Sequence, residues 1–306
     1  KVFANYGMIL INLGELKKAE IYTRKAIGIN PNYAIGYSNL GNIFQRHGEF
    51  QKAEVFIRKA IELDPNFSMA YFNLGNIFQR HGEFQKAEVF IQKAIELDPN
   101  FSMAYFNLGN IRKDLGKTKE SLNSFIKVIE INPQYVYTYN AITELLKYAD
   151  PSQFETTKLK KILNLLLDKN DVNHRELFRA FNFLYKKDLI NSLEQSENIF
   201  SKIKFITHNK AIMNAVEKII FCDPELEKVL ESFRRNICYR VAEKTNDINE
   251  NELDFLIALG KQCFLNEYIY LTGKEEIICI NKIIERCKKE EINKINITLI
   301  SCYFPL

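Results

Sequence analysis

The sequence predicts an all-α protein in which a solenoid of helix–turn–helix repeats is followed by an irregular all-helical region. Three observations lead to this prediction. Four of the seven prolines recur every 34 residues, at Pro31, Pro65, Pro99 and Pro133. A fixed period of 34 residues is typical of a repeat array. Within each period, apolar residues recur with helical spacing. Ten of the twelve glycines lie within the first 116 residues, so the chain changes character beyond that point.

The prolines divide the first part of the chain into four repeats and a partial fifth. The four units are residues 1–33, 34–67, 68–101 and 102–135. The fifth begins at Val136, and the period is lost after Tyr148. The sequence therefore predicts two domains, a solenoid over residues 1–148 and an all-helical region over residues 149–306.

The middle of the array is almost a copy of itself, because residues 39–72 and 73–106 differ only at Arg58 and Gln92. We expect each unit to consist of two helices joined by a tight turn. A glycine that can adopt a positive φ ends the first helix, and an Asn-Pro or Asp-Pro pair ends the second. The predicted turn glycines are Gly14, Gly48, Gly82 and Gly116.

A second set of glycines lies inside the first helices, where glycine costs about 1 kcal/mol relative to alanine. Such a cost needs a packing reason, so we expect these glycines to let the paired helix approach through its alanines. The glycines are Gly7, Gly41, Gly75 and Gly109, and the alanines are Ala19, Ala53 and Ala87. The fourth unit departs from the pattern at Arg112 and Ser121, which predicts looser packing there.

Beyond the array, segments still show helical periodicity and none alternates convincingly, so we expect no sheet. The expected helices span about 136–148, 154–168, 173–186, 190–203, 208–221, 224–243, 250–267, 273–289 and 292–302. Two of these helices begin with a capping signal in the sequence. Asp223 is the expected N-cap before Pro224 at the first helical position, and Thr272 with Glu275 is expected to form a capping box. The clearest surface loop is expected at residues 246–251.

Composition and charge exclude several functional classes. The net charge of +4 lies in residues 1–135, where 17 Lys and Arg face 13 Asp and Glu, too small an excess for a nucleic-acid-binding protein. No apolar run reaches eighteen residues, which argues against a membrane span. No signal peptide is evident, so we expect a cytoplasmic protein. Only Gly260 and Gly273 follow residue 116, too few for a glycine-rich phosphate loop.

The sequence also predicts no metal, no cofactor and no catalytic residues in this chain. None of the six cysteines forms a C-x-x-C pair, so we expect reduced thiols packed on helices rather than a zinc site. Cys263 stands among polar residues but has only Lys261 nearby to lower its pKa, so packing is the expected role. His174 and His208 are each expected to begin a helix, without a nearby acid or nucleophile.

The N-L-G-N runs, the two sets of glycines, the alanines and the closing prolines together resemble the tetratricopeptide repeat, over residues 1–148. The resemblance implies a series of helix pairs whose first helices line a concave groove. Such a groove takes an extended peptide or a helix of a protein partner and carries no chemistry.

Two columns of asparagines are expected to face this groove. The first is Asn5, Asn39, Asn73 and Asn107, and the second is Asn42, Asn76 and Asn110. An amide both donates and accepts, so a column of amides can hold a peptide main chain, and the arrangement resembles the asparagine ladder of O-linked N-acetylglucosamine transferases. The alternative is that these are repeat residues with solvated amides. If the ladder exists, replacing Asn73 and Asn107 by alanine should weaken peptide binding and leave thermal stability nearly unchanged.

Four further residues complete the predicted peptide site. Arg46 and Arg80 could bind a carboxylate or phosphate at the groove edge, although exposed arginines on repeats commonly serve solubility. Phe72 and Phe106 would form an apolar pocket if they are exposed, and belong to the core if they lie between repeats. Tetratricopeptide repeats that bind the C-termini of chaperones carry lysines beside such asparagines. The residues beside the first asparagine column here are not lysines, so a chaperone C-terminus is not the expected ligand.

The stretch Gly260–Tyr270, with the helix of Arg234 and Arg235 before it, resembles an all-helical segment of bacterial tetratricopeptide repeat proteins. This resemblance covers roughly residues 205–306. In that family a class I S-adenosylmethionine-dependent methyltransferase domain follows, which implies a role in recruiting or orienting a substrate.

The leading hypothesis is therefore a scaffold that binds a protein or peptide partner, without nucleic acid, membrane or cofactor. The alternative is the substrate-recruiting part of a methyltransferase whose catalytic domain lies outside this chain. Glycosyl transfer, by analogy with the asparagine ladder, is the weakest hypothesis because it needs a nucleotide-sugar domain. The near-identical repeats also allow two chains to exchange units, so a homodimer is compatible with the sequence.

Overall fold

The computed structural model describes residues 2–194, 199–243, 248–266, 272–289 and 293–304. In these residues every regular element is helical, which confirms the predicted all-α class. The chain divides into two compact units, Lys1–Leu145 and Leu146–Leu306. The division falls inside α9 (Val136–Tyr148), at whose end the boundary was predicted.

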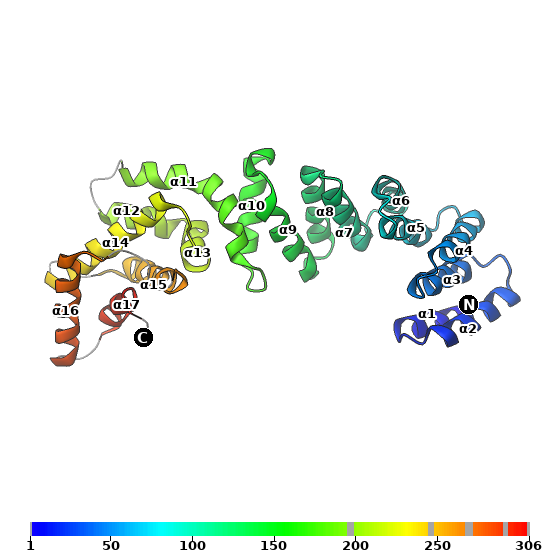
Figure 1. The fold of residues 1–306 in the computed structure, drawn as a ribbon, viewed down its shortest axis with the longest axis horizontal. Coiled ribbons are helices and arrows are strands. Elements are labelled where there is room, and N and C mark those ends of the chain that lie inside the picture. Colours follow the sequence, from blue (N-terminus) through cyan, green and yellow to red (C-terminus); the bar gives the residue numbers. More distant parts are fainter. Residues whose placement is uncertain (1, 195–198, 244–247, 267–271, 290–292, 305–306) are drawn as a thin grey trace. The chain divides into compact units, whose positions relative to one another are not determined.

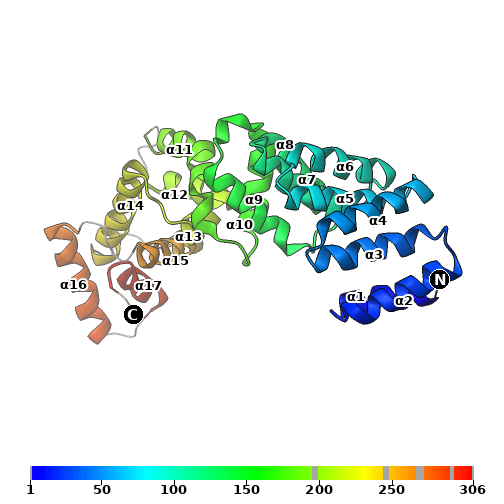
Figure 2. The same cartoon turned by 45° about the vertical axis from the view of Figure 1, so that its right-hand side comes forward.

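The first unit consists of helix pairs stacked side by side (Figures 1 and 2). The pairs are α1 (Val2–Asn12) with α2 (Leu16–Ile29), α3 (Ala34–Arg46) with α4 (Phe50–Leu63), α5 (Ser68–Arg80) with α6 (Phe84–Leu97), and α7 (Ser102–Asp114) with α8 (Thr118–Ile131). Each pair corresponds to one predicted repeat, and α9 begins the fifth. The core consists of two clusters, one between the first and second repeats and one from the second to the fourth, because each repeat buries its apolar face against the next.

The predicted turns are confirmed. Each of the four turn glycines has a positive φ between 72° and 79°. At Gly48 (φ 78°) the amide of Gly48 donates to the carbonyl of Gln45, and the amide of Glu49 donates to the carbonyl of Phe44 at 2.9 Å. This pair of bonds is a Schellman motif, which satisfies the carbonyls left free at the end of α3.

An asparagine or aspartate side chain stabilises the turn that follows the second helix of each repeat. At Asp64 the backbone turns extended (φ −141°), and its carboxylate accepts a hydrogen bond from the amide of Asn66 at 3.0 Å, across Pro65. The equivalent bonds form at Asn30, Asp98 and Asn132. The side chain takes the place of a backbone acceptor, so each repeat connects to the next with the same geometry.

The internal glycines do admit a close helix approach, but the main partner is not the alanine. A Cβ added at Gly41 would lie 2.3 Å from Cγ1 of Ile57 and 3.2 Å from the carbonyl oxygen of Ala53. At Gly75 the same contacts involve Ile91 and Ala87. The alanine brings its backbone close, and the isoleucine one turn later fills the space that the missing Cβ leaves.

The helix pair of the fourth repeat is in less extensive contact than the pairs of the second and third repeats, in line with the looser packing predicted, but its polar residues are hydrogen-bonded. Arg112 donates to Glu88 at 2.9 Å and to Oγ of Ser124 at 3.0 Å. Lys117 donates to the second oxygen of Glu88 at 2.6 Å, and Ser121 donates to the carbonyl of Gly109 at 2.7 Å. The polar residues that break the apolar pattern bond to one another across the third and fourth repeats.

This network replaces an aromatic pair. Arg112 and Ser124 take the places that Phe78 and Phe90 occupy in the preceding repeat. The rings of Phe78 and Phe90 stack with centroids 5.2 Å apart, and the same stack occurs one repeat earlier, between Phe44 and Phe56. The fourth repeat therefore exchanges a stacked pair of rings for a set of hydrogen-bonded polar groups.

The one residue that differs between the duplicated segments, Arg58 in one and Gln92 in the other, is consistent with the polar network of the fourth repeat. Arg58 forms an ion pair with Glu54 and lies 6.0 Å from the ring of Phe90 in the next repeat. An arginine at position 92 would therefore lie beside Ser124 and its partner Arg112. Gln92 avoids that repulsion and leaves Glu88, the equivalent of Glu54, to pair with Arg112 instead.

The carboxylate of Glu88 makes the stability of this network pH-dependent. Burial alone would raise the pKa of Glu88, but hydrogen bonds from Lys117 and Arg112 outweigh it and hold the pKa below its ordinary value of 4.5. A lowered pKa stabilises the folded state above the ordinary value, and this stability is lost as the pH falls through the lowered pKa. We expect Glu88→Gln to reduce the free energy of unfolding by about 2 kcal/mol at pH 7.

Urea denaturation of the parent chain and Glu88→Gln between pH 7 and pH 3 checks this. The stability difference should shrink steadily below pH 4.5. Glu62→Gln is the matched control, because Glu62 is 68% exposed in its ion pair with Lys59. A difference that does not change with pH would contradict the assigned role of the carboxylate.

The second unit is an irregular set of helices. They are α10 (Thr156–Leu167), α11 (Phe178–Glu194), α12 (Ile199–His208), α13 (Lys210–Lys218), α14 (Pro224–Glu243), α15 (Glu250–Leu265), α16 (Lys274–Lys289) and α17 (Lys294–Ser301), with short 3-10 turns at Pro151–Gln153 and His174–Leu177. Asp223 caps α14 as predicted, with its carboxylate accepting from the amides of Glu225 and Leu226.

Three local predictions in this unit are wrong. The break predicted between helices at 186 and 190 does not occur, because α11 continues through Lys186 to Glu194 without a glycine or proline to stop it, and the predicted helix over 190–203 lies partly outside the described residues. His208 ends α12 rather than beginning a helix, since Asn209 caps α13 through the amides of Ala211 and Ile212. The expected loop at 246–251 lies partly outside the described residues, and its last two residues belong to α15.

The third wrong prediction is the capping box of Thr272 and Glu275. The helix α16 begins at Lys274, and the amide of Gly273 donates to Glu276 instead, at 3.3 Å. Glu276 is fully buried and bonded to Arg234. The tertiary partner of Glu276 thus sets the start of the helix one residue later than the local signal.

Candidate functional site

The first helices of the repeats form one layer of the array. Consecutive first helices contact one another, α1 with α3, α3 with α5 and α5 with α7. Residues at positions i, i+4, i+7 and i+11 share one side of a helix. We call the side that carries Ile35, Asn42 and Arg46, and the residues at the same places in the next two repeats, the inner face. Its members on α5 and α7 are Met69, Asn76, Arg80, Met103, Asn110 and Asp114.

The first asparagine column lies largely between repeats rather than on the inner face. Asn39 is 6% exposed and its amide donates to the carbonyl of Ala4 at 3.2 Å. Asn73 is 7% exposed and donates to Oγ of Ser38 at 3.2 Å. The expectation that both look freely into a groove is therefore wrong, because each amide is already bonded to the preceding repeat.

The other two members of this column differ. Asn107 is half-buried and donates to Oδ1 of Asn76 at 2.7 Å, again reaching the preceding repeat. Asn5 is exposed on α1. Removing a buried amide that is bonded in this way costs about 1 kcal/mol or more. Alanine at Asn73 and Asn107 should thus lower stability, contrary to the expectation from the sequence.

The second column, Asn42, Asn76 and Asn110, is half-buried and lies on the inner face. Asn76 accepts from Asn107 through its oxygen, which orients its NH2 group as a donor. Half-buried amides at a regular spacing can donate to and accept from a peptide main chain. These three residues thus form a column of partly accessible amides on the inner face.

Arg46 and Arg80 lie at the C-terminal ends of α3 and α5 and are both exposed. Arg46 also donates from Nη1 to the carbonyl of Ile11 at 2.7 Å, which caps the last turn of α1. Asp114 takes this place on α7, and its neighbour Lys113 pairs with Glu144 at 3.2 Å. The basic character of this edge is confined to the second and third repeats.

Phe72 and Phe106 belong to the packing of the array. Phe72 is 5% exposed, and its ring centroid lies 4.8 Å from that of Phe101. Phe106 is half-buried between Phe125 and Tyr135, at 5.7 Å and 5.2 Å. Of the two predicted alternatives, the core assignment holds for Phe72, since a buried ring cannot line an open pocket.

An apolar row at the other edge of the inner face was not predicted. Ile35, Met69, Met103 and Tyr137 recur once per repeat at the starts of α3, α5, α7 and α9, and they are 36%, 42%, 49% and 69% exposed. The sequence does contain a signal for this row, because an apolar residue recurs in each repeat two helical turns before the asparagine of the second column. Methionine adapts to varied apolar surfaces, so this row can accept side chains of a ligand.

A buried cluster occupies the second unit. Arg234 donates from Nε to Glu276 at 3.0 Å, and its guanidinium carbon lies 4.6 Å from the ring of Tyr303. The hydroxyl of Tyr303 donates to the same carboxylate. Burial raises the pKa of Cys238, beside Tyr303, to about 11. Arg234, Glu276 and Cys238 are buried and Tyr303 is half-buried, and the bonds of Glu276 connect α14, α16 and the C-terminal segment.

Cys263 is fully buried against this cluster. A hydrogen bond from Cys302 lowers the pKa of Cys263, burial opposes it, and the Arg234 guanidinium adds to the lowering. The predicted neighbour Lys261 instead pairs with Glu217. The cation near this thiol is thus Arg234, which only tertiary folding brings close.

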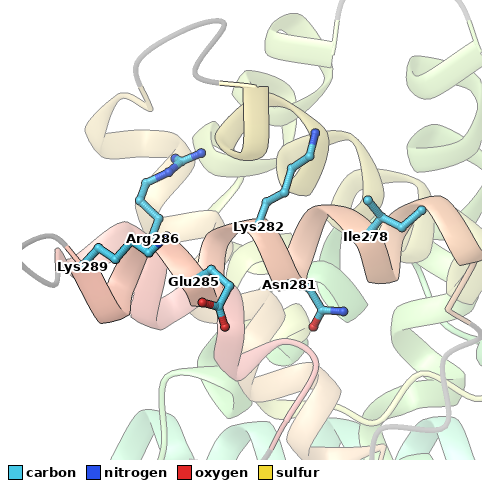
Figure 3. Close-up of a pocket in the computed structure, with 6 residues that line it drawn as sticks. All are labelled: Ile278, Asn281, Lys282, Glu285, Arg286 and Lys289. Atoms are coloured by element: carbon cyan, nitrogen blue, oxygen red, sulfur yellow. The ribbon is translucent and has the colours of Figure 1, made fainter.

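The described surface also has a shallow hollow along α16 (Figure 3). Its lining comes from that one helix: Ile278, Asn281, Lys282, Glu285, Arg286 and Lys289. Arg286 donates to the carbonyls of Val241 and Ala242, at 3.0 Å and 2.7 Å, and Lys282 pairs with Glu243. The basic residues here cap the end of α14 and do not converge on a ligand.

Two properties bear on other classes of site. Within the described ranges, no three His, Cys, Asp or Glu side chains are grouped in a way that could bind a metal ion. None of the helices in the described part of the chain has the length and apolar character needed to span a bilayer.

Comparison with known proteins finds family models that match most of the first unit. Family models described as tetratricopeptide repeat match residues 34–67 and 68–101, residues 1–33, and residues 90–123. The last match is displaced by one helix from the repeat of α7 and α8. No curated protein sequence is significantly similar to this chain. None of the matches supports the resemblance of residues 205–306 to a methyltransferase-associated segment.

Several solved structures are similar to parts of this chain. PilF of Pseudomonas aeruginosa is 19% identical, with a TM-score of 0.50, and the alignment covers 68% of this chain and 96% of that one. MamA is 21% identical over 60% of this chain and 96% of its own, with a TM-score of 0.42. YrrB, described as a protein of the same repeat type with an unusual peptide-binding site, is 22% identical over 54% and 84%, with a TM-score of 0.42. Residues 1–123 of this chain are thus similar to tetratricopeptide repeats, in agreement with the helix pairs that the structure shows there.

Proposed function

We propose that this chain is a protein-interaction scaffold that binds an extended peptide or a helix of a protein partner on the inner face. Tetratricopeptide repeats generally act as non-catalytic scaffolds for protein partners. The observation that supports this face is the side-by-side order of three rows: exposed apolar residues, half-buried amides and, on two repeats, arginines. We further propose a cytoplasmic location, which the six free cysteines favour.

The three rows define what a ligand must offer. The amides of Asn42, Asn76 and Asn110 suit a peptide main chain, because they donate and accept without selecting a side chain. The apolar row of Ile35 and its equivalents favours a ligand with apolar residues along one edge. Arg46 and Arg80 favour a carboxylate along the opposite edge. The preferred ligand is thus a peptide with one apolar and one acidic side.

Selection from a displayed peptide library against the full chain supplies the probe for testing this proposal. The triple variant Asn42→Ala, Asn76→Ala and Asn110→Ala should bind a selected peptide about tenfold more weakly or worse, because up to three hydrogen bonds are lost. Isothermal titration calorimetry measures the difference. Gln51→Ala with Gln85→Ala, on exposed positions of α4 and α6, is the matched control and should bind like the parent. Equal affinities of the triple variant and the control would place peptide binding elsewhere.

A role in recruiting a substrate to a methyltransferase would still require a cofactor site outside this chain. In the methyltransferase family that the sequence resembles, that site is a glycine loop after a strand, whereas the described residues here are helical. We expect calorimetry with S-adenosylmethionine and this chain to show no binding. A dissociation constant in the micromolar range would contradict this expectation.

A further inference from the structure

The charges along the inner face change sign from one repeat to the next. Arg46 and Arg80 end α3 and α5, and Asp114 takes the same place on α7. On α9, Glu144 continues the row of Asn110. The two arginines and the two carboxylates are all exposed. We call the arginines the basic part of this face and the carboxylates its acidic part.

These charges remain largely uncompensated within the chain. Within the described ranges, neither Arg80 nor Asp114 forms an ion pair with another residue. Arg46 donates to the carbonyl of Ile11, which is neutral, so its charge is not cancelled. Glu144 pairs with Lys113 at 3.2 Å, but its side chain is still 58% exposed. Both parts can therefore attract a charged ligand.

The carboxylate of Asp114 has no evident role in packing. The helices α5 and α7 are identical except at their C-terminal ends, where Arg112, Lys113 and Asp114 replace Phe78, Gln79 and Arg80. Arg112 bonds to Glu88, and Lys113 pairs with Glu144, so both have partners inside the array. Asp114 faces solvent instead. The change of sign at this position is thus a property of the surface rather than of the core.

The repeat geometry sets the distance between the charges. Consecutive first helices contact one another, and the axes of packed helices lie about 9 Å apart. An extended peptide advances about 3.3 Å per residue, so neighbouring repeats are about three of its residues apart. A helical ligand advances about 1.5 Å per residue and would need about six. The amides of the inner face suit the extended form, because a helix already bonds its own main-chain groups.

We propose that the ligand is an extended peptide whose charges are separated in the same way. Two carboxylates about three residues apart face Arg46 and Arg80, and a lysine or arginine about three residues further along faces Asp114. This inference rests on the proposed function and names the charge order of its ligand. Unlike charges meet in one orientation and like charges in the reverse, so the order fixes how the peptide lies along the array.

Displayed peptide libraries of equal composition test the charge order on the full chain. One library contains Asp-x-x-Asp-x-x-Lys and its reverse, where x is any residue. The other contains Asp-x-x-Lys-x-x-Asp, which has the same charges in an order that the face does not match. The first library should yield binding peptides and the second should not. Equal recovery from the two libraries would overturn the inference.

Exchange of two charges tests the assigned residues. Arg80→Asp with Asp114→Arg keeps the net charge and changes two exposed side chains. A peptide from the first library should bind this variant about tenfold more weakly than the parent, because two attractions become repulsions. The same peptide with its acidic and basic residues exchanged should prefer the variant over the parent. Lys59→Glu with Glu62→Lys exchanges an exposed ion pair on α4 and is the control, which should bind like the parent.

Isothermal titration calorimetry separates this inference from the proposed function. If the triple asparagine variant loses affinity while the charge exchange has no effect, the charge order is wrong and peptide binding at the inner face stands. If neither variant loses affinity, both proposals are wrong. Selected peptides whose charges recur about every six residues would indicate a helical ligand and would also overturn the inference.

Discussion

Replacing Arg234 by alanine should lower the free energy of unfolding of the second unit by about 3–5 kcal/mol. The reason is the carboxylate of Glu276, which is fully buried and takes a hydrogen bond from Arg234 at 3.0 Å. Removing one partner of a buried ion pair leaves the other charge without compensation in a medium of low polarity. Urea denaturation followed by circular dichroism measures the change.

The neighbouring arginine is the control for this prediction. Arg235 also approaches Glu276, at 3.7 Å, but its side chain is 44% exposed and remains hydrated. Arg235→Ala should therefore change stability by at most about 1 kcal/mol. If Arg234→Ala and Arg235→Ala lowered the free energy of unfolding by similar amounts, the burial of the ion pair would not explain the effect of Arg234.

Replacing Gly75 by valine should destabilise the first unit by about 3 kcal/mol. An added Cβ at Gly75 would lie 2.7 Å from two carbons of Ile91 and 3.3 Å from the carbonyl oxygen of Ala87. The isoleucine is held in the core and the carbonyl belongs to a helix backbone, so neither can move away at small cost. Thermal denaturation of the parent and the variant gives the difference.

Gly28, near the end of α2, supplies a contrast within the same unit. It is helical, but nothing lies within 4 Å of an added Cβ. Gly28→Ala should therefore increase stability by about 0.5–1 kcal/mol through helix propensity alone. If Gly75→Ala were stabilising to the same degree, the close helix approach at the internal glycines would not explain their presence.

Repetition made the fold of the first unit predictable. The turn glycines and the Asn-Pro and Asp-Pro pairs specify the helix ends through local backbone preferences, which act within a few residues. The second unit has fewer such signals. The start of α16 at Lys274 depends on a tertiary partner, because Glu276 in its first turn bonds to Arg234, and a single sequence does not reveal such partners.

The candidate site was predictable only in part. Periodicity identified the helices that carry it, but it could not separate the side of a helix that faces the preceding repeat from the side that faces solvent. Asn39 and Asn42 are less than one turn apart, yet Asn39 bonds to Ala4 while Asn42 remains accessible. Likewise, Arg112 interrupts the apolar pattern, and its partner Glu88 lies in another repeat.

Methyl NMR of the methionines tests peptide binding at the inner face most directly. The chain has four methionines. Met69 and Met103 lie on the inner face, Met8 stands at the place of Asn42 on α1, and Met213 lies in α13 of the second unit. Titration of methyl-labelled full chain with a selected peptide should shift the Met69 and Met103 signals and leave Met213 unchanged. Saturable binding that leaves both Met69 and Met103 unshifted would contradict the proposed function.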